Sequence, residues 1–563
     1  MHLVRRTAFV VVAMALSNGV DASAQQLRGV VRDSASGRPI MGAVVSLIDS
    51  AGTTIMRGVS NEVGVYQIPF LGAARRGRIV RLGFRPRNIT LPAMAGTVTE
   101  LNLTLAWLAT ILEPVRTFAN AHCPRRKDER ATAALLEQTR AGLLTSVVQR
   151  ESDPPMLILY DFEREMDGTS DRISSQNVRR DSLERAPKSY QAAYTAGEFI
   201  TRGFMRDDAN AQWFFVPDAD VLLDDEFTLG YCFRIVDAER ARPNQVGLGF
   251  VAAESKRNRI DVDGVIWIDT AKRSIGDMTY RYAGFPSRID RLDPGGLVAF
   301  RDLSTVSMID NWSMRLIGAH YDSTFRNTPT VERLYAYQRG GLVAHATWPD
   351  GRTWHADLGK LRAHVRTSNG KPAAGTVVRI PDTPYRATVD SAGFLELSDL
   401  VNGPYTLAVV DPRLEPIRFD LPTSYNFLAV NGTTVRDSIK IQTVEEAVAL
   451  KCLSDKRYTV GDSIFVLGRA IDRKGNLVGD VQISAFTEPS QTGVIEERGE
   501  PAALPHLIGG YTTGTNGLFQ FCAPRLETGV TIRARLSGRD LPVLRMPVTG
   551  RLTVIPLVVD RAP

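Results

Sequence analysis

Two histidines and two tryptophans gather in one short segment of this 563-residue chain. His345, Trp348, Trp354 and His355 surround a Pro-Asp-Gly turn in the run HATWPDGRTWH. The face of an indole can stack on a sugar ring or close a hydrophobic core. These four residues are therefore the candidate site for a glycan or a peptide, and ordinary core aromatics are the alternative interpretation.

The histidine spacing does not fit a zinc peptidase. Such an enzyme needs a motif of the H-E-x-x-H type, with two histidines one helical turn apart. None of the seven histidines belongs to that motif. Ser463 follows Gly461 and Asp462 between two strand-like runs, whereas a serine nucleophile needs a strand-to-helix elbow. The sequence thus predicts no enzyme, no catalytic residue, no cofactor and no metal site.

Three pairs of aspartates could also do chemistry, as calcium ligands or as the paired carboxylates of a glycosidase. They lack the D-x-D-x-D-G series of a calcium loop, and nothing in the sequence sets the separation of their carboxylates. We interpret them as solvated turns, with a structural calcium site as the alternative. The pairs are Asp218/Asp220, Asp224/Asp225 and Asp261/Asp263.

Four cysteines allow three disulfide pairings. Sequence position favours Cys452 with Cys522, and Cys123 with Cys232. Four free, buried thiols are the alternative. A zinc site is disfavoured because no two cysteines have the short spacing of zinc ligands.

The N-terminus is typical of a signal peptide. Arg5 and Arg6 precede an apolar run that ends at Leu16, and Ala22-Ser23-Ala24 has the small-residue pattern of a cleavage site. We predict a signal peptide over residues 1–24 and an exported chain, located in the periplasm, at the outer membrane or outside the cell. The apolar run is too short to span a bilayer, and no transmembrane segment is predicted in the mature chain.

One pattern occurs three times and predicts a mainly β fold. Each copy reads as a strand, a polar turn with Gly, a second strand, a turn in which a small or polar residue precedes Gly, and further strands. The copies begin near Leu27, Leu361 and Phe465.

The first copy resembles the carboxypeptidase regulatory-like domain, a transthyretin-like or carbohydrate-binding-like β-sandwich that also precedes the plug of TonB-dependent outer-membrane receptors. The second and third copies resemble it as well. The resemblance implies three sandwiches and leaves the function open, since the module occurs in unrelated extracellular proteins. The matching residues of the first copy are Gly29, Val31, Asp33, Gly37, Pro39, Ala43, Val45, Leu47, Gly64 and Tyr66.

A different domain separates the first copy from the other two. Asp128 stands at the start of an expected helix that Asp153-Pro154-Pro155 ends, with residues 137–140 on the face opposite its apolar stripe. Antiparallel strands follow and are expected to form a sheet packed on this helix. The predicted domains are a sandwich over 25–110, a helix-plus-sheet domain over 120–355, and sandwiches over 360–442 and 445–560.

Composition favours a binding protein over a nucleic-acid protein. The net charge is +6, and the basic residues are scattered among acids. We therefore predict an exported, non-enzymatic cell-envelope protein that binds a glycan, a surface polymer or a protein partner. The alternatives are an accessory of outer-membrane transport or assembly, whose middle sheet holds a hydrophobic ligand or docks on a receptor, and a hydrolase with its site in the middle domain.

Overall fold

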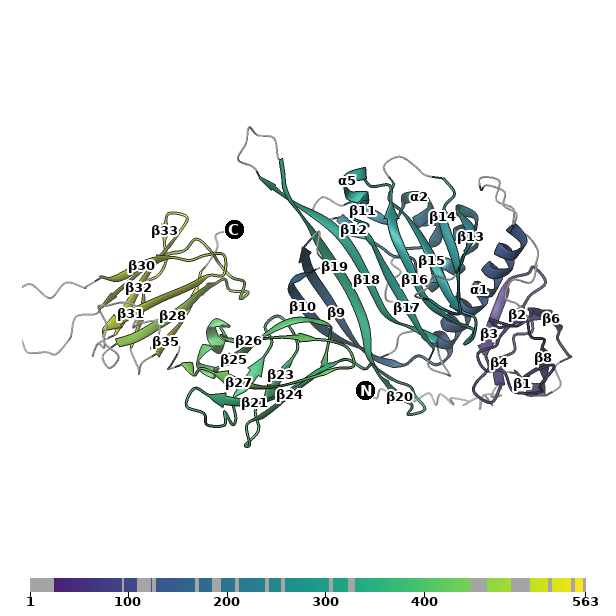
Figure 1. The fold of residues 1–563 in the computed structure, drawn as a ribbon, viewed down its shortest axis with the longest axis horizontal. Coiled ribbons are helices and arrows are strands. Elements are labelled where there is room, and N and C mark those ends of the chain that lie inside the picture. The colour runs from purple at the N-terminus through teal and green to yellow at the C-terminus, as the bar shows by residue number, and fades with distance from the viewer. Residues whose placement is uncertain are drawn as a thin grey trace, which may run out of the picture. The chain divides into compact units, whose positions relative to one another are not determined.

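The structure is a computed structural model, and Figure 1 shows its fold. The predicted signal peptide lies outside the described residues. The described residues are 25–93, 96–108, 123, 128–167, 172–184, 194–207, 212–237, 242–254, 259–302, 307–322, 330–444, 446, 463–487, 507–524, 529–547 and 552–559.

The fold is mainly β, as predicted, and the chain divides into two compact units. The first comprises residues 1–156, 184–314 and 347–352. The second comprises residues 157–183, 315–346 and 353–563.

The first unit begins with a β-sandwich. One sheet has the order β4-β1-β7 with β8 also paired to β1, and the other has the order β3-β2-β5-β6. Apolar residues between the sheets, among them Leu27, Val45 and Tyr66, form its core. The strands are β1 (Gln26–Asp33), β2 (Val44–Ile48), β3 (Thr54–Val59), β4 (Val65–Pro69), β5 (Arg76–Val80), β6 (Arg87–Thr90), β7 (Val98–Glu100) and β8 (Leu103–Leu105).

The second unit contains two sandwiches with the same topology, which confirms the predicted repeat. In each copy the first strand lies between an antiparallel neighbour and a parallel last strand, as β1 does. The second sandwich contains β21 (Gly359–Thr367), β22 (Val377–Arg379), β23 (Arg386–Thr388), β24 (Phe394–Leu400), β25 (Gly403–Val410), η1 (Pro412–Ile417), β26 (Leu421–Ala429) and β27 (Thr434–Ile441).

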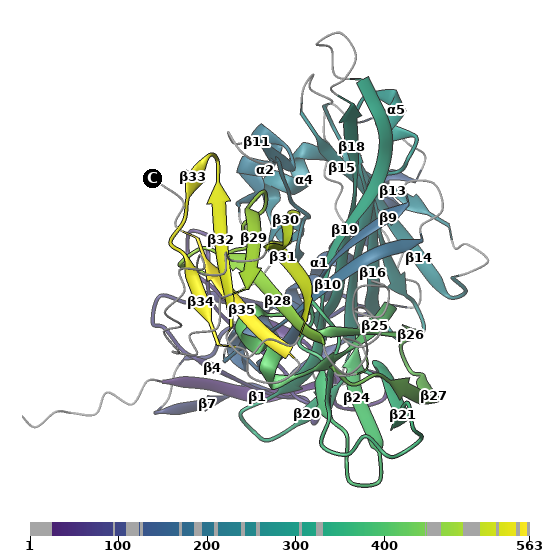
Figure 2. The same cartoon turned by 90° about the vertical axis from the view of Figure 1, so that its left-hand side faces the viewer.

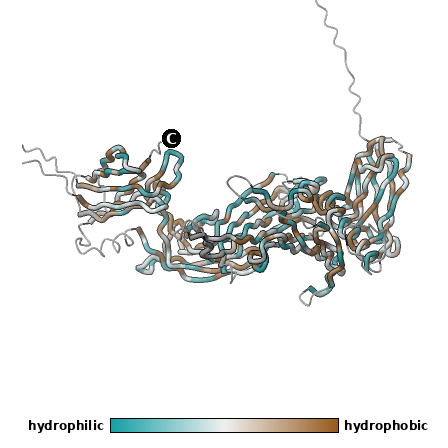
Figure 3. The backbone as a smooth tube through the Cα atoms, turned by 90° about the horizontal axis from the view of Figure 1, so that it is seen from above, coloured by the Kyte–Doolittle hydropathy of each residue, from teal (hydrophilic) through white to brown (hydrophobic). Residues whose placement is uncertain are grey.

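The third sandwich pairs β28 with β31 and β35 in one sheet, and its other sheet is built on β29 and β32 (Figure 2). Hydrophobic and hydrophilic residues alternate along the sandwich strands, as expected where one strand face is buried (Figure 3). The strands are β28 (Ser463–Ile471), β29 (Gln482–Thr487), β30 (Leu507–Thr512), β31 (Leu518–Pro524), β32 (Val530–Leu536), β33 (Arg539–Asp540), β34 (Leu544–Met546) and β35 (Leu552–Val558).

In all three sandwiches the same chemistry forms the turn that precedes β4, β24 or β31, the antiparallel neighbour of the first strand. In each copy an Asn or Asp side-chain oxygen accepts a hydrogen bond from a backbone N–H beyond the turn. A glycine with positive φ, which L side chains rarely adopt, precedes the strand. The pairs are Asn61 and Gly64, Asp390 and Gly393, and Asn516 and Gly517.

Gly29 of β1 is required by close packing. A Cβ atom built at Gly29 would lie 1.9 Å from the carbonyl oxygen of Leu101. We expect Gly29→Ala to lower the free energy of unfolding of the first sandwich by about 1–3 kcal/mol, because a backbone segment must move. Urea unfolding followed by hydrogen exchange of β1 measures this. Gly72→Ala is the control, since nothing lies within 4 Å of its Cβ position; equal losses in both variants would contradict the explanation.

The rest of the first unit is α1 with short helices and strands. α1 contacts β13, β14 and β16, so the predicted helix-on-sheet packing is observed. The elements are α1 (Glu129–Ser152), α2 (Ala196–Arg202), β11 (Met205–Asp207), β12 (Gln212–Phe214), α3 (Ala219–Leu223), α4 (Asp225–Gly230), β13 (Tyr231–Val236), β14 (Gln245–Ala252), β15 (Asp261–Asp269), β16 (Ser274–Ala283), α5 (Ser287–Asp290) and β17 (Gly295–Asp302).

The middle sheet has the strand order β10-β9-β19-β18-β17-β16-β15-β14-β13, with β20 paired to β19. Its long strands β18 and β19 contribute residues to both units. Within the second unit, Tyr160, Phe162 and Val178 share a hydrophobic core with the second sandwich. The remaining strands are β9 (Met156–Asp167), β10 (Ile173–Leu183), β18 (Ser307–Asp322), β19 (Thr330–Thr347) and β20 (Thr353–His355).

The polar face predicted for α1 is wrong. Gln138 and Thr139 are buried, and the Gln138 side chain accepts a hydrogen bond from Gly83 N–H at 2.8 Å and donates one to the Phe84 carbonyl at 3.2 Å. The helix lies between the middle sheet and the first sandwich, so both of its sides are covered. Asp128 occupies the position before the helix, but its side chain makes no capping hydrogen bond.

A disulfide joins Cys123 to Cys232 of β13. This is the pairing that the sequence favoured for these two residues, and it crosslinks positions 109 residues apart. Cys452 lies outside the described residues, and its pairing with Cys522 stays a prediction.

Candidate functional site

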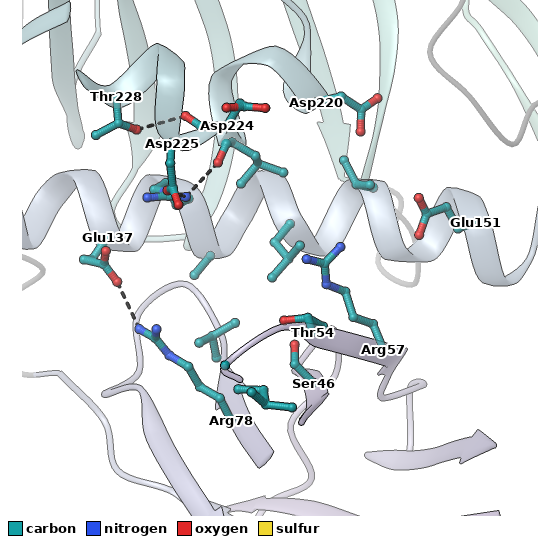
Figure 4. A pocket seen from close by; sticks show the side chains of 18 of the residues that line it. Ser46, Thr54, Arg57, Arg78, Glu137, Glu151, Asp220, Asp224, Asp225 and Thr228 are labelled. Carbon is teal, nitrogen blue, oxygen red and sulfur yellow. Dashed lines mark hydrogen bonds and ion pairs between the residues drawn. The ribbon is translucent and has the colours of Figure 1, made fainter. Parts of the chain in front are cut away.

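A cleft of about 740 Å³ in the first unit is the candidate binding site. Helix α1 runs through it, with strands β2, β3 and β5 of the first sandwich on one side and α3 and α4 on the other (Figure 4). The volume falls in the range of small-ligand and short-peptide sites. Because three segments far apart in the sequence build it, the fold itself creates the cleft.

Most charged side chains of the cleft are already engaged. Arg78 of β5 pairs with Glu137 of α1 at 3.1 Å, which ties the sandwich to the helix. Arg140 pairs with Asp225 at 2.7 Å and also donates to the Leu223 carbonyl, which ties α1 to α3 and α4. These pairs fix the walls of the cleft.

The aspartates near residue 220 have structural partners. Asp220 accepts from Arg150 of α1 at 2.8 Å. Asp218 is fully buried and accepts from the backbone N–H of Val221, while Asp224 accepts from that of Glu226. Asp261 is also buried and pairs with Arg259 at 2.9 Å. The interpretation of Asp218 and Asp261 as solvated turns is therefore wrong, because one caps a helix and the other forms a buried ion pair.

Two charged side chains in the cleft are free for a ligand. Among the described residues, the side chains of Arg57 in β3 and Glu151 in the last turn of α1 have no hydrogen bond and no ion pair, and both residues are exposed. Figure 4 shows Arg57 extending from its strand toward α1, with Glu151 farther along the helix. The cleft thus offers one cation and one anion at separate positions.

Aliphatic side chains and the hydroxyl groups of Ser46, Thr54 and Thr228 make up most of the remaining lining. The set contains no aromatic side chain, so the cleft lacks the stacking platform that a sugar ring uses. It suits a ligand with apolar groups and charges of both signs. The aliphatic lining residues are Ile48, Val80, Ala141, Leu144, Val147, Leu223 and Leu229.

The residues that the sequence singled out lie elsewhere. Trp348 is only 5% exposed, so its ring faces are covered and cannot stack on a sugar. Its predicted role in glycan binding is therefore wrong, and the alternative of a core aromatic holds for this residue. Trp354 of β20 is half-buried, and its predicted binding role stays a prediction.

His345 and His355 do come together, in the second unit. Their Nδ1 atoms are in hydrogen-bond contact, and His345 Nε2 lies 2.9 Å from a carboxylate oxygen of Asp399. His345 thus turns its two nitrogens to opposite partners, so the three side chains do not converge on one point. Within the described ranges, no group of three or more His, Cys, Asp or Glu side chains could hold a metal ion.

Two phenols lie near Asp399, the carboxylate partner of His345. Tyr385 donates to the Asp399 carbonyl at 2.9 Å, and burial raises the pKa of Tyr385. Burial also raises the pKa of Tyr160, with a smaller contribution from the Asp399 carboxylate. Both phenols therefore stay protonated at neutral pH.

Comparison with known families decides the character of the first sandwich. Residues 26–106 match the carboxypeptidase regulatory-like domain. The predicted resemblance of the first sandwich is confirmed. The sandwich side of the cleft belongs to this regulatory-like domain, because β2, β3 and β5 lie inside the matched range. No curated protein sequence matches the chain.

Solved structures with similarity to the chain include the Bacillus anthracis TIE protein and several bacterial pilins. The Bacillus anthracis TIE protein is 10% identical with a TM-score of 0.14; the match covers 62% of this chain and 63% of that one, less than two thirds of its length. A streptococcal ancillary pilin is 14% identical, with 46% and 80% covered and a TM-score of 0.14. The major pilin subunit of Bacillus cereus, BcpA, is 8% identical, with 74% and 98% covered and a TM-score of 0.13. Scores at this level establish no shared activity or partner.

In the part of the chain that the structure describes, no helix has the length and apolar character needed to cross a membrane.

Sequence reasoning missed Arg57 and Glu151. Arg57 alternates with apolar neighbours in a short strand, and Glu151 ends a helix, so each reads as an ordinary exposed residue. The only available signal was the long helix next to a sandwich domain, which implies an interface but does not locate it.

Proposed function

We propose that this chain is an exported, non-enzymatic cell-envelope protein that binds a polypeptide partner in the cleft of its first unit. The observation that carries the proposal is the pair of free charged side chains, Arg57 and Glu151, in a cleft whose other lining is mostly ion-paired, aliphatic or hydroxyl-bearing. An extended segment with an acidic residue for Arg57, a basic residue for Glu151 and apolar residues between them satisfies this lining.

The proposal agrees with the rest of the chain. The regulatory-like domain supplies a rigid wall, and three ion pairs hold that wall and the short helices on α1. Export rests on the predicted signal peptide. The alternative of an accessory in outer-membrane transport stays a prediction, and in that case the bound polypeptide would belong to a membrane partner.

Selection from a random peptide library displayed on phage tests the proposal. We expect the full chain to enrich peptides that carry one acidic and one basic residue with apolar residues between them. Arg57→Ala and Glu151→Ala should each weaken binding of a selected peptide about tenfold, since each removes one charge-assisted contact.

Arg28→Ala is the matched control, because Arg28 is exposed on β1 of the same domain and does not line the cleft. Enrichment of peptides without charge preference, or equal affinity of the two cleft variants and the wild-type protein, would rule the cleft out as the site.

A further inference from the structure

The second sandwich presents one strongly basic sheet face. In the sheet ordered β24-β21-β27, the residues of β21 alternate, with Leu361, Ala363 and Val365 buried in the core. The residues between them point outward, because successive side chains of a strand alternate between the two faces. The same holds for β24, whose Leu395 and Leu397 are buried.

Basic side chains lie in register along β21 and β27 on this outward face. Arg362 lies opposite Arg436 on the neighbouring strand, and Arg366 lies opposite Lys440. Lys360 starts the row on β21, and all five of these residues are exposed. Neighbouring strands are about 4.8 Å apart, and outward residues of one strand repeat about every 7 Å, so the five cations form a compact array.

Acids on or near the face offset part of this charge. Glu396 of β24 pairs with Arg362 at 2.8 Å, in an exposed contact. Asp437 accepts a hydrogen bond from Tyr425. Glu446 accepts one from Ser368. The pKa of Glu446 is lowered by this hydrogen bond, by a second one from the Thr443 backbone and, to a smaller degree, by the charge of Lys440. Among the described residues, the side chains of Lys360 and Arg436 have no hydrogen-bond or ion-pair partner.

His364 and Phe394 stand at the centre and edge of the array. His364 accepts from Arg366 at 2.9 Å and lies 2.9 Å from the Ala392 carbonyl, so both of its nitrogens are used within the sheet. Phe394 packs its ring 5.0 Å from that of His364 and is still 59% exposed. One aromatic face is therefore open to a ligand beside the cations.

We propose that the outward face of β24, β21 and β27 binds an acidic polysaccharide. Guanidinium and ammonium groups in a flat array pair with carboxylates repeated along a polymer, and the guanidinium fork fits a carboxylate with two hydrogen bonds. The C–H face of a sugar ring packs on an exposed aromatic ring such as Phe394. The polymer lies across the strands and contacts cations of both β21 and β27.

The same observations disfavour two other polyanions. A single-stranded nucleic acid binds through several aromatic platforms for successive bases, and this face has one. A face that binds a membrane surface carries apolar side chains around its cations. Here other outward residues of β24 and β27 are polar, such as Ser398 and Ser438.

Titration of the full chain with polygalacturonate tests the proposal, with neutral dextran and single-stranded DNA as competing probes. We expect polygalacturonate to bind, dextran not to bind, and affinity to fall as salt screens the array. The triple variant Lys360→Gln, Arg436→Gln, Lys440→Gln should bind on the order of tenfold more weakly. Phe394→Ala should weaken polygalacturonate binding, because it removes the ring on which the sugar packs.

The control is the triple variant Arg28→Gln, Arg386→Gln, Lys474→Gln, which removes the same charge from exposed positions outside this face. Equal losses of polygalacturonate affinity in the two triple variants would show that the polyanion is attracted by the net charge of the protein rather than by this face, and would overturn the proposal. Tighter binding of DNA than of polygalacturonate, or no loss in the first triple variant, would overturn it as well. The cleft lies in the other unit, and its peptide binding should be unchanged in every one of these variants, so the two proposals fail separately.

Discussion

Replacing Cys123 and Cys232 by serine is expected to destabilise the first unit by about 3–5 kcal/mol. A crosslink between residues 109 positions apart removes much of the freedom of the unfolded chain, and loops of that length give the largest effects in the chain-entropy description. Hydrogen exchange of α1 and β13 in rising urea concentrations measures the loss where it arises, because a chain of several domains does not unfold in one step.

The two single variants provide the control for this prediction. Cys123→Ser and Cys232→Ser should each lose as much as the double variant, because either change removes the same bond. Exchange from the second and third sandwiches should not change. A loss below about 0.5 kcal/mol, the range of ordinary surface substitutions, would show that the disulfide adds nothing to the fold.

The second large effect is expected at the interface between the regulatory-like domain and α1. Gln138→Leu should cost about 2–4 kcal/mol, because it leaves the N–H of Gly83 and the carbonyl of Phe84 without their buried partner. We expect the cleft to loosen with it, so that hydrogen exchange of α1 speeds up and peptide affinity falls. Apolar contacts of Val44 and Val80 with Ala141 remain in the variant.

The adjacent position gives a matched control. Glu137→Gln removes an ion pair with Arg78, whose side chain is 44% exposed, and should cost less than about 1 kcal/mol. If Glu137→Gln destabilised the interface more than Gln138→Leu, the buried amide would not be the contact that holds the domain on the helix.

Much of the fold could be predicted because its signals are local. The turns at Asn61 and Asp390 are set by a side chain and a glycine three residues apart, so the threefold repeat is visible in the sequence. The end of α1 is likewise set by the Asp153-Pro154-Pro155 stop, and the helix ends at Ser152. Such features depend on neighbours along the chain rather than on the tertiary structure.

The site could not be predicted, because tertiary packing decides it. Gln138 reads as a solvated residue until the regulatory-like domain is placed against α1, and Trp348 reads as a sugar platform until it is buried. Arg57 and Glu151 are separated by 94 positions (151 minus 57), and only the fold brings both to one cleft. The histidine pair was predicted as a group, but its partner Asp399 comes from the second sandwich.

The most direct test of the central claim is a double-mutant cycle between the cleft and a selected peptide. Arg57→Glu should weaken binding of a peptide whose acidic residue faces it, and changing that acidic residue to arginine should weaken binding to the wild-type protein. The two changes together should restore affinity to within about threefold, a coupling of the size found for direct charge pairs. Losses that simply add would contradict a polypeptide bound in this cleft through Arg57.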